Sequence, residues 1–298
     1  MWRHVTLLFL AFCLAAPARA DVLNVVYPAA ESVDDRRFDD LVAILEAVLT
    51  ATEPDFGPFR MRPSTQVMTS RRYVHELMAG RTPNLIWTST SKEREQKVRP
   101  IRIPLRRGLL SFRISLIHKG DQSTVDRIQS PDDLKGVRIV QGTGWGDIEI
   151  FNAYGAEVIT SPYESLFRMI EADRALLFPR GVNEVFDEFE ARRNDLPDLA
   201  VEQNLLIYYP WPYYFFVAKD NEALATRLEV GLDRIIESGE LETIFQKYHG
   251  KVLERARLEE RRLIRLENPL LPAETPLDDE RLWLRPASLF DGAGAKPR

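Results

Sequence analysis

A glycine-rich stretch, Gly142-Thr143-Gly144-Trp145-Gly146-Asp147, is the part of this sequence whose residue types first suggest chemistry. It follows a short apolar run, residues 137–140, and precedes a segment with helical spacing. Glycines allow the backbone to approach a ligand closely, and the free N–H groups at a helix start carry partial positive charge. The pattern therefore predicts a site for an anion such as a carboxylate or a phosphate. The alternative is an ordinary strand-to-helix turn that holds no ligand.

Other chemical patterns are weaker. A dinucleotide-binding fingerprint would need a third glycine where this chain has Asp147, so that kind of site is excluded. The histidines that could act in a mature chain, His75, His118 and His249, stand in unrelated segments without the spacing of a metal site. The serines near residue 90 lack the motif of a nucleophile elbow. The sequence favours binding over catalysis, and we expect neither a cofactor nor a metal.

Residues 1–20 predict a cleaved secretory signal peptide. Basic residues precede an apolar run, residues 5–16, which is too short to span a membrane, and Ala18-Arg19-Ala20 has the small-x-small cleavage pattern. Cys13 is the only cysteine, and Phe12 before it does not fit a lipoprotein signal. We therefore expect a periplasmic chain without thiols or disulfides.

The acidic balance of the chain bears on its partners. Loss of Arg3 and Arg19 with the signal peptide would change the formal charge from −5 to −7. A negative chain is a poor partner for nucleic acid or for an anionic membrane surface. We expect a monomer that binds a small molecule.

Strand-like and helix-like apolar patterns alternate along the chain. The first part predicts strands at residues 22–27, 59–63 and 84–87, separated by helices at 41–49 and 71–78. From residue 130 the pattern repeats, with strands at 137–140, 156–159 and 175–178 and helices at 147–153, 165–173 and 182–192. Such alternation indicates α/β units with parallel sheets, in which ligands bind at the carboxyl ends of the strands.

Two long extended segments, 109–118 and 205–218, connect the two units. The predicted fold class is α/β with two lobes, a discontinuous first lobe and two hinge strands, an arrangement that closes on a ligand. We expect lobe 1 at residues 21–115 and 213–250, and lobe 2 at residues 116–212.

Residues 251–298 form a C-terminal extension. We expect a charged helix at 252–266, a proline-rich stretch, and a segment that docks through Leu282, Trp283 and Leu284. The tail, residues 291–298, is expected to be disordered.

Over residues 21–250 the chain resembles the periplasmic solute-binding proteins of extracellular family 3, the polar amino-acid type of ABC transporters. Four features carry the resemblance. They are Tyr27 and Glu31 after the first strand, the run from Trp87 to Arg94, Leu134-Lys135-Gly136-Val137 leading to Gln141-Gly142-Thr143, and the terminal Gly239-x5-Phe245-x2-Tyr248. The resemblance implies the type II periplasmic binding fold.

The resemblance also implies roles for individual residues. Thr88, Ser89, Thr90 and Arg94 match the positions that grip the ligand's α-carboxylate, a role that suits a guanidinium and hydroxyl groups. The alternative for Arg94 is a solvated residue in a charged run. Thr143 and the Gly144 amide match the contribution of the second lobe to the same carboxylate.

Arg180 departs from the family pattern, which places an aspartate there to bind the ligand's ammonium group. Arg180 would repel an ammonium and attract a second anion. With Arg94 it predicts a ligand that is anionic at both ends, such as a dicarboxylate, or one that lacks the amino group. The alternative is a structural ion pair of Arg180 with Glu31 or Asp35.

Tyr27, Trp87 and Trp145 are expected to form apolar walls of the cleft, although each could instead belong to the core. The predicted function is binding of a small anionic solute for delivery to an inner-membrane permease. A ligand-sensing module for a membrane signalling protein is the second possibility. A dehydratase-like enzyme, with Glu31 or Glu184 as the acid, is the third.

Overall fold

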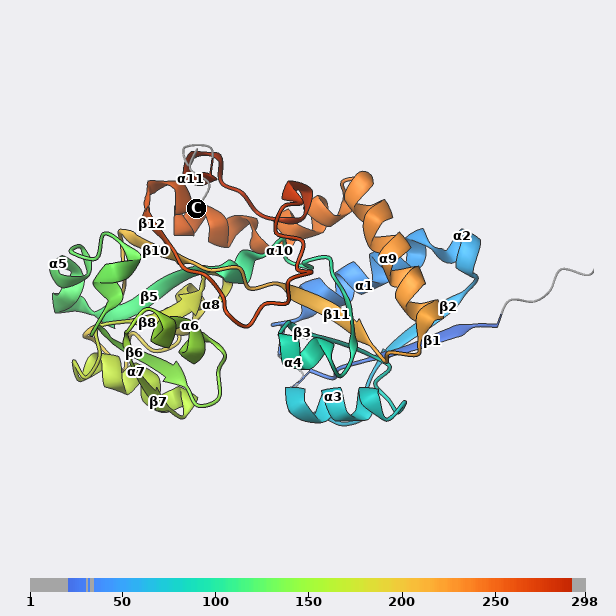
Figure 1. Ribbon diagram of the computed structural model, residues 1–298, viewed down its shortest axis with the longest axis horizontal. Coiled ribbons are helices and arrows are strands. Elements are labelled where there is room, and N and C mark those ends of the chain that lie inside the picture. The colour runs from blue at the N-terminus through green and yellow to red at the C-terminus, as the bar shows by residue number, and fades with distance from the viewer. Residues whose placement is uncertain (1–20, 31, 33–34, 291–298) are drawn as a thin grey trace, which may run out of the picture.

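The structure is a computed structural model that describes residues 21–30, 32 and 35–290. The expected signal peptide, Glu31 and the expected disordered tail lie outside the described residues. The described chain forms two α/β lobes at opposite ends of the molecule's longest axis (Figure 1).

Lobe 1 contains two small sheets. Strands β1 (Leu23–Tyr27) and β2 (Phe59–Pro63) pair in parallel, and a second, antiparallel sheet has the order β3 (Leu85–Ser89), β11 (Tyr213–Val217), β4 (Arg99–Ile101). Its helices are α1 (Asp39–Ala51), α2 (Glu53–Phe56), α3 (Ser70–Met78), α4 (Lys92–Glu95) and α9 (Glu222–Glu237).

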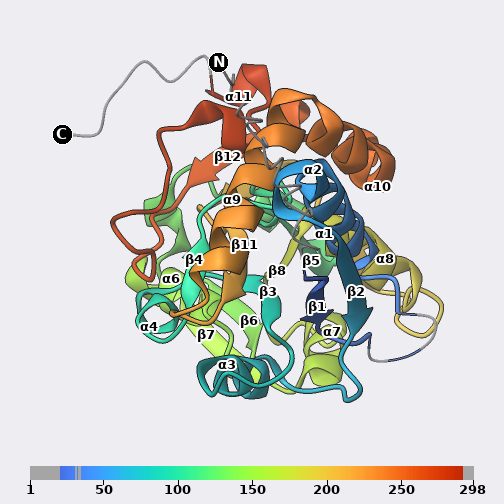
Figure 2. The same ribbon diagram turned by 90° about the vertical axis from the view of Figure 1, so that its right-hand side faces the viewer.

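The apolar stripe of α1 explains how lobe 1 packs. Leu41, Ile44, Leu45 and Val48 recur at helical spacing and are buried in one core with residues of α9. The two helices lie side by side (Figure 2). Gly231 allows this approach, because a Cβ there would lie 2.6 Å from both a methyl group and the carbonyl oxygen of Val48.

Lobe 2 is built on a sheet of order β12 (Arg262–Arg265), β10 (Leu205–Tyr208), β5 (Phe112–His118), β8 (Phe178–Gly181), with β9 (Leu199–Val201) also paired to β5. Strands β6 (Arg138–Gly142) and β7 (Glu157–Ser161) pair in parallel, and Ile139 bridges to Leu177 beside β8. The α-helices of this lobe are α5 (Gln122–Val125), α6 (Asp147–Ala153), α7 (Tyr163–Glu171), α8 (Val182–Glu190) and, at the end of the described chain, α11 (Ala287–Phe290). Short 3-10 turns stand at Leu109–Ser111, Lys119–Asp121, Pro131–Leu134, Leu258–Glu260 and Glu280–Leu282.

Three features differ from the sequence expectations. The strand pairing is mixed rather than all parallel, because the hinge strands β5 and β11 run antiparallel to their neighbours. The expected lobe boundary after residue 115 lies inside β5, whose first residue already pairs within lobe 2. The helix expected at 252–266 is wrong: α10 (Glu240–Ala256) ends where Arg257 adopts a left-handed conformation, and β12 follows.

The expectation for the later extension is confirmed in part. Leu282 and Trp283 are buried, with 7% and 5% of their surface exposed. Of the described helices, none combines the length and the apolar character needed to cross a lipid bilayer.

Candidate functional site

Two adjoining cavities form the candidate site. The first, which we call the lobe-1 cavity, has a volume of about 700 Å³ and lies at the carboxyl ends of β1, β2 and β3 beside the start of α1. The second, the interlobe cavity, has a volume of about 930 Å³. Both volumes are in the range of small-molecule sites. They share Ser32, Asp35, Arg36, Phe38 and Tyr248, so they form one continuous cleft.

Aromatic rings form one wall of the lobe-1 cavity. The rings of Tyr27 and Trp87 stack with centroids 5.5 Å apart, and Phe38 lies 6.0 Å from Trp87. Trp87 also belongs to the core of lobe 1, with 6% of its surface exposed. Burial, and then the nearby Glu46 carboxylate, raises the pKa of Tyr27. Tyr27 and Trp87 therefore both line this cavity, and Trp87 is mostly held in the core.

Both lobes line the interlobe cavity. Lobe 1 contributes Asp40, Arg106 and Tyr213, and lobe 2 contributes Trp145, Arg180, Asn183 and Glu184. Helix α10 completes the wall with Tyr248, His249 and Val252. The carboxamide oxygen of Asn183 is buried there without a hydrogen-bond partner.

On the lobe-1 side of the interlobe cavity lie three polar residues, Asp40, Arg106 and His249, that the sequence analysis did not predict. Arg106 donates from Nε and Nη2 to the two carboxylate oxygens of Asp40, at 2.6 and 2.7 Å, and Nε2 of His249 lies 3.0 Å from Asp40. Burial would raise the pKa of Asp40, but Arg106 and His249 outweigh it and hold the pKa well below its usual range. The three residues are far apart in the chain, so no local pattern could have grouped them.

Arg180 lies in the wall of the interlobe cavity, but its guanidinium already pairs with carboxylates of the protein. Its guanidinium donates to both oxygens of Glu188, at 2.6 and 2.7 Å, and lies 3.1 Å from a carboxylate oxygen of Glu184. It also stacks 4.7 Å from the ring centroid of Trp145. Burial opposes the charge, yet these carboxylates raise the pKa of Arg180. Among the described residues, Arg180 therefore has its ion-pair partners on α8, and Glu31, named above as a possible partner, lies outside the described residues.

The hydroxyl groups between β3 and α4 bond mainly within lobe 1. Thr88 and Ser70 hydroxyls lie 3.5 Å apart, and Thr90 donates to Glu95 at 2.6 Å. The hydroxyl of Ser91 accepts the amide of Arg94 and so caps α4. Ser89, Thr88, Thr90 and Arg94 line neither of the two cavities.

Arg94 differs from the other arginines around the cleft. Its guanidinium donates to the carbonyl oxygen of Ser89, and no carboxylate of a described residue lies within ion-pair distance. Burial lowers the pKa of Arg94, and the opposing electrostatic effects of Tyr213 and Glu93 are smaller. Tyr213 itself lines the interlobe cavity.

The glycine-rich turn of lobe 2 has fewer free amide groups than its sequence suggests. The amides of Thr143 and Trp145 donate to the carbonyl oxygens of Ser161 and Gly142. Thr143 and Gly144 are exposed and line neither cavity, whereas the Trp145 ring reaches the interlobe cavity. Gly144 has a φ of 80°, which favours glycine.

The start of α6 carries an internal carboxylate. Asp147 accepts a hydrogen bond of 2.5 Å from Tyr209, and Arg113 Nη2 lies 3.2 Å from the same oxygen. The protein thus places its own anion at the helix start, where the sequence predicted a ligand.

Comparisons with known proteins address the fold. No protein-family model and no curated protein matches this sequence. Among solved structures, the probable extracellular amino-acid-binding protein YtmK of a Bacillus subtilis ABC transporter is similar with a TM-score of 0.57 and 16% identity, over 77% of this chain and 99% of that one.

Two further structures are similar at comparable levels. The Salmonella typhimurium periplasmic binding protein with high arginine specificity has a TM-score of 0.52 and 16% identity, covering 77% of this chain and 99% of its own. The ligand-binding core of GluR0 in complex with L-glutamate has a TM-score of 0.51 and 13% identity, over 78% and 99% of the two chains. The chain therefore has the two-lobed α/β fold of the type II periplasmic binding proteins.

Proposed function

We propose that this protein binds a small solute bearing one carboxylate group in the periplasm and delivers it to an inner-membrane transporter. Arg94, which lies outside the two cavities, would hold the carboxylate, and the rest of the solute would extend into the cleft. The observation that carries the proposal is the half-buried guanidinium of Arg94, which has no acidic partner among the described residues. A desolvated charge without a counter-ion is unfavourable, and a bound carboxylate would remove that cost.

The chemistry of Arg94 fits a carboxylate. A guanidinium has five N–H groups in a planar fork that can bind both oxygens of a carboxylate. Within the described chain, the guanidinium of Arg94 makes one hydrogen bond, to the carbonyl oxygen of Ser89. The neighbouring Ser89 is half-exposed, and its hydroxyl would bind the same anion. Desolvation around Arg94 would strengthen this interaction relative to water.

A single anionic group is proposed because each arginine found in the lining of the two cavities has a carboxylate partner. Arg36 pairs with Asp39, Arg106 with Asp40, and Arg180 with Glu188. Arg192 likewise pairs with Glu164. A second ligand anion at Arg180 would have to displace Glu188, so a dicarboxylate is no longer favoured.

The rest of the solute would lie along the lobe-1 cavity. Tyr27, Phe38 and Tyr248 offer ring faces there, and Glu46 brings a carboxylate for which no ion pair is found in the described chain. Apolar and aromatic walls with a few polar groups are typical of small-molecule sites. This wall suits an apolar, aromatic or cationic side group.

We propose a role in transport because YtmK, a protein of similar fold, is described as a probable binding protein of an ABC transporter. In vivo cross-linking of the exported protein, followed by mass spectrometry, would test this step. Capture of an ABC permease would support delivery. Capture of a membrane kinase or cyclase would instead support the sensing alternative.

Thermal unfolding in the presence of matched ligand pairs tests the ligand chemistry. Each pair would be a carboxylic acid and its uncharged amide, drawn from amino acids and keto acids, together with dicarboxylates. A ligand at one hundred times its dissociation constant should stabilise the chain by about 2.7 kcal/mol, a shift of several degrees. We expect shifts with monocarboxylates and none with their amides. Equal shifts with acids and amides would refute the carboxylate anchor.

A further inference from the structure

Residues 257–290, which we call the C-terminal strap, contact both lobes (Figure 1). The strap follows α10, which itself packs against α1 of lobe 1 and α8 of lobe 2. The chain therefore crosses between the lobes at α10 and in the strap, in addition to the two hinge segments.

The first part of the strap is built into lobe 2. Strand β12 pairs in parallel with β10, with Leu205 opposite Arg262 and Tyr208 opposite Arg265. Ile264 and Leu266 are buried in the core of this lobe. A strand that extends a sheet and buries two apolar side chains is an integral element of the lobe rather than a loose tail.

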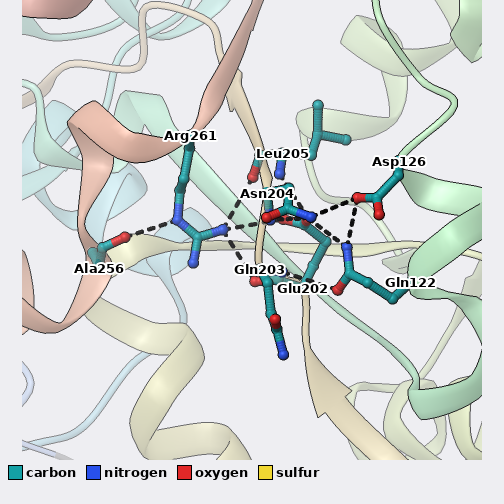
Figure 3. Close-up of polar contacts among 8 residues, drawn as sticks. All are labelled: Gln122, Asp126, Glu202, Gln203, Asn204, Leu205, Ala256 and Arg261. Atoms are coloured by element: carbon teal, nitrogen blue, oxygen red, sulfur yellow. Dashed lines mark hydrogen bonds and ion pairs between the residues drawn. The ribbon is translucent and has the colours of Figure 1, made fainter.

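A buried ion pair fixes this attachment. Arg261 Nη1 lies 3.1 Å from Oε2 of Glu202, a residue with no exposed surface, and Arg261 Nε donates to the Ala256 carbonyl at 2.7 Å. Glu202 also accepts from the Leu205 amide at 2.6 Å and from the Gln122 side chain at 3.1 Å. Figure 3 shows this network joining the strap to the β9–β10 turn and α5.

The middle of the strap then bridges to lobe 1. The carbonyl oxygen of Leu270 accepts the amide of Lys92 at 3.0 Å, and that of Pro269 accepts the Lys92 ammonium at 2.9 Å. Lys92 is the first residue of α4, the helix that carries Arg94.

The side chain of Leu270 meets the opposite lobe. Its Cδ1 lies 3.1 Å from the position that a Cβ on Gly146 would take, beside the ring of Trp211. One residue thus binds lobe 1 through its backbone and contacts the glycine-rich turn of lobe 2 through its side chain.

The last part of the strap makes a second bridge. Trp283 packs on Gly108, and the Leu284 amide donates to the Arg107 carbonyl at 2.6 Å, where the chain leaves lobe 1. The strap then returns to lobe 2, where Phe290 lies 5.5 Å from Tyr208 and 6.2 Å from Phe112.

We propose that the C-terminal strap sets the separation of the lobes, through Leu270 between α4 and the Gly142–Gly146 turn, so that their relative position does not depend on a bound solute. In a two-lobed protein joined only by hinge strands, the free chain can rotate open about the hinge. Here such rotation must pull Leu270 away from Gly146 or break the hydrogen bonds that Lys92 makes to Leu270 and Pro269. This inference concerns the movement of the lobes and holds for any ligand chemistry.

Pulsed electron paramagnetic resonance on the full mature chain tests the proposal. A chain begun at Asp21 contains no cysteine, so Met78→Cys in lobe 1 and Arg168→Cys in lobe 2, both exposed, would carry the only spin labels. They lie on α3 and α7, on the side of the molecule away from the strap (Figure 1). We expect one narrow distance distribution in the absence of any ligand.

The strap is then perturbed at its bridge. Leu270→Asp should broaden the distribution and shift it to longer distances, because a carboxylate is poorly accommodated against Gly146 and Trp211. Lys92→Ala, at an exposed position, should act in the same direction. Leu277→Asp makes the same chemical change at an exposed strap position and should leave the distribution unchanged. A cooperative unfolding transition for each variant confirms that it folds.

Two results would overturn the proposal. One is a broad distribution in the unsubstituted chain. The other is a distribution in folded Leu270→Asp that matches that of Leu277→Asp.

Discussion

The guanidinium of Arg180 is held in a two-pronged ion pair by Glu188, with nitrogen–oxygen distances of 2.6 and 2.7 Å. Both side chains are mostly buried, at 8% and 13% exposed, and Tyr163 donates a further hydrogen bond of 2.7 Å to Glu188. The pair lies in the wall of the interlobe cavity. Glu188 balances the positive charge of Arg180, for which the sequence analysis predicted a ligand anion as partner.

Removal of one partner of this pair should destabilise the fold. Glu188→Ala leaves a buried guanidinium with fewer counter-charges, so we expect a loss of about 3–5 kcal/mol in the free energy of unfolding. The double substitution Arg180→Met with Glu188→Leu should recover most of the loss, since apolar replacements of buried pairs are often neutral. Urea unfolding at neutral pH measures both. A loss below about 1 kcal/mol in Glu188→Ala would show that the pair is effectively solvated.

The docking of Trp283 on Gly108 gives a second prediction, with a matched control. Gly108 and Gly80 have similar left-handed φ values, 67° and 64°, but a Cβ on Gly108 would lie 2.3 Å from the Trp283 ring, while one on Gly80 meets nothing within 4 Å. Gly80→Ala should cost about 1–2 kcal/mol for backbone strain alone. Gly108→Ala should cost about 1–3 kcal/mol more. Equal losses in urea unfolding would mean that Trp283 does not dock there in solution.

The Asp40–Arg106 pair predicts an acid-dependent loss of stability. The folded pKa of Asp40 lies below its unfolded value, so its contribution is present above about pH 4 and is lost as the pH falls toward the folded pKa. Asp40→Asn should remove this contribution and make the stability of the chain less steep below about pH 4. Urea unfolding from pH 6 to pH 3 compares the two proteins. Parallel stability curves would contradict the assignment.

Much of the fold could be predicted from local patterns. The strand at 59–63 and the helix at 147–153 match β2 and α6 at both ends, and the hinge segments at 109–118 and 205–218 contain β5, β10 and β11. These elements carry strong apolar periodicity. The strand after Ala256 could not be predicted, because Arg262–Arg265 has two arginines around two apolar residues, a spacing that also suits a helix, and forms a strand by pairing with β10.

The site was harder to predict than the fold. Tyr27, Trp87, Trp145 and Arg180 line the cleft. Tyr27 ends β1 and Trp145 follows β6, while Trp87 and Arg180 lie within β3 and β8. The charge state of the cleft depends on side-chain pairing, such as Arg106 with Asp40 and Arg180 with Glu188, which a spacing argument does not reveal. Spacing located the arginines, and the packed structure shows that Arg94, unlike Arg180, has no acidic partner in the part of the chain that it describes.

The binding role of Arg94 is the central claim, and calorimetric titration of Arg94→Ala tests it most directly. The titrant would be the carboxylate with the largest thermal shift, and Arg71→Ala, which removes an exposed arginine of α3, would be the matched charge control. Truncation of one partner of a desolvated charge pair costs about 2–5 kcal/mol, so Arg94→Ala should bind at least roughly 30-fold more weakly than the unsubstituted chain. Arg71→Ala should bind as the unsubstituted chain does. An unchanged dissociation constant in folded Arg94→Ala would contradict the account.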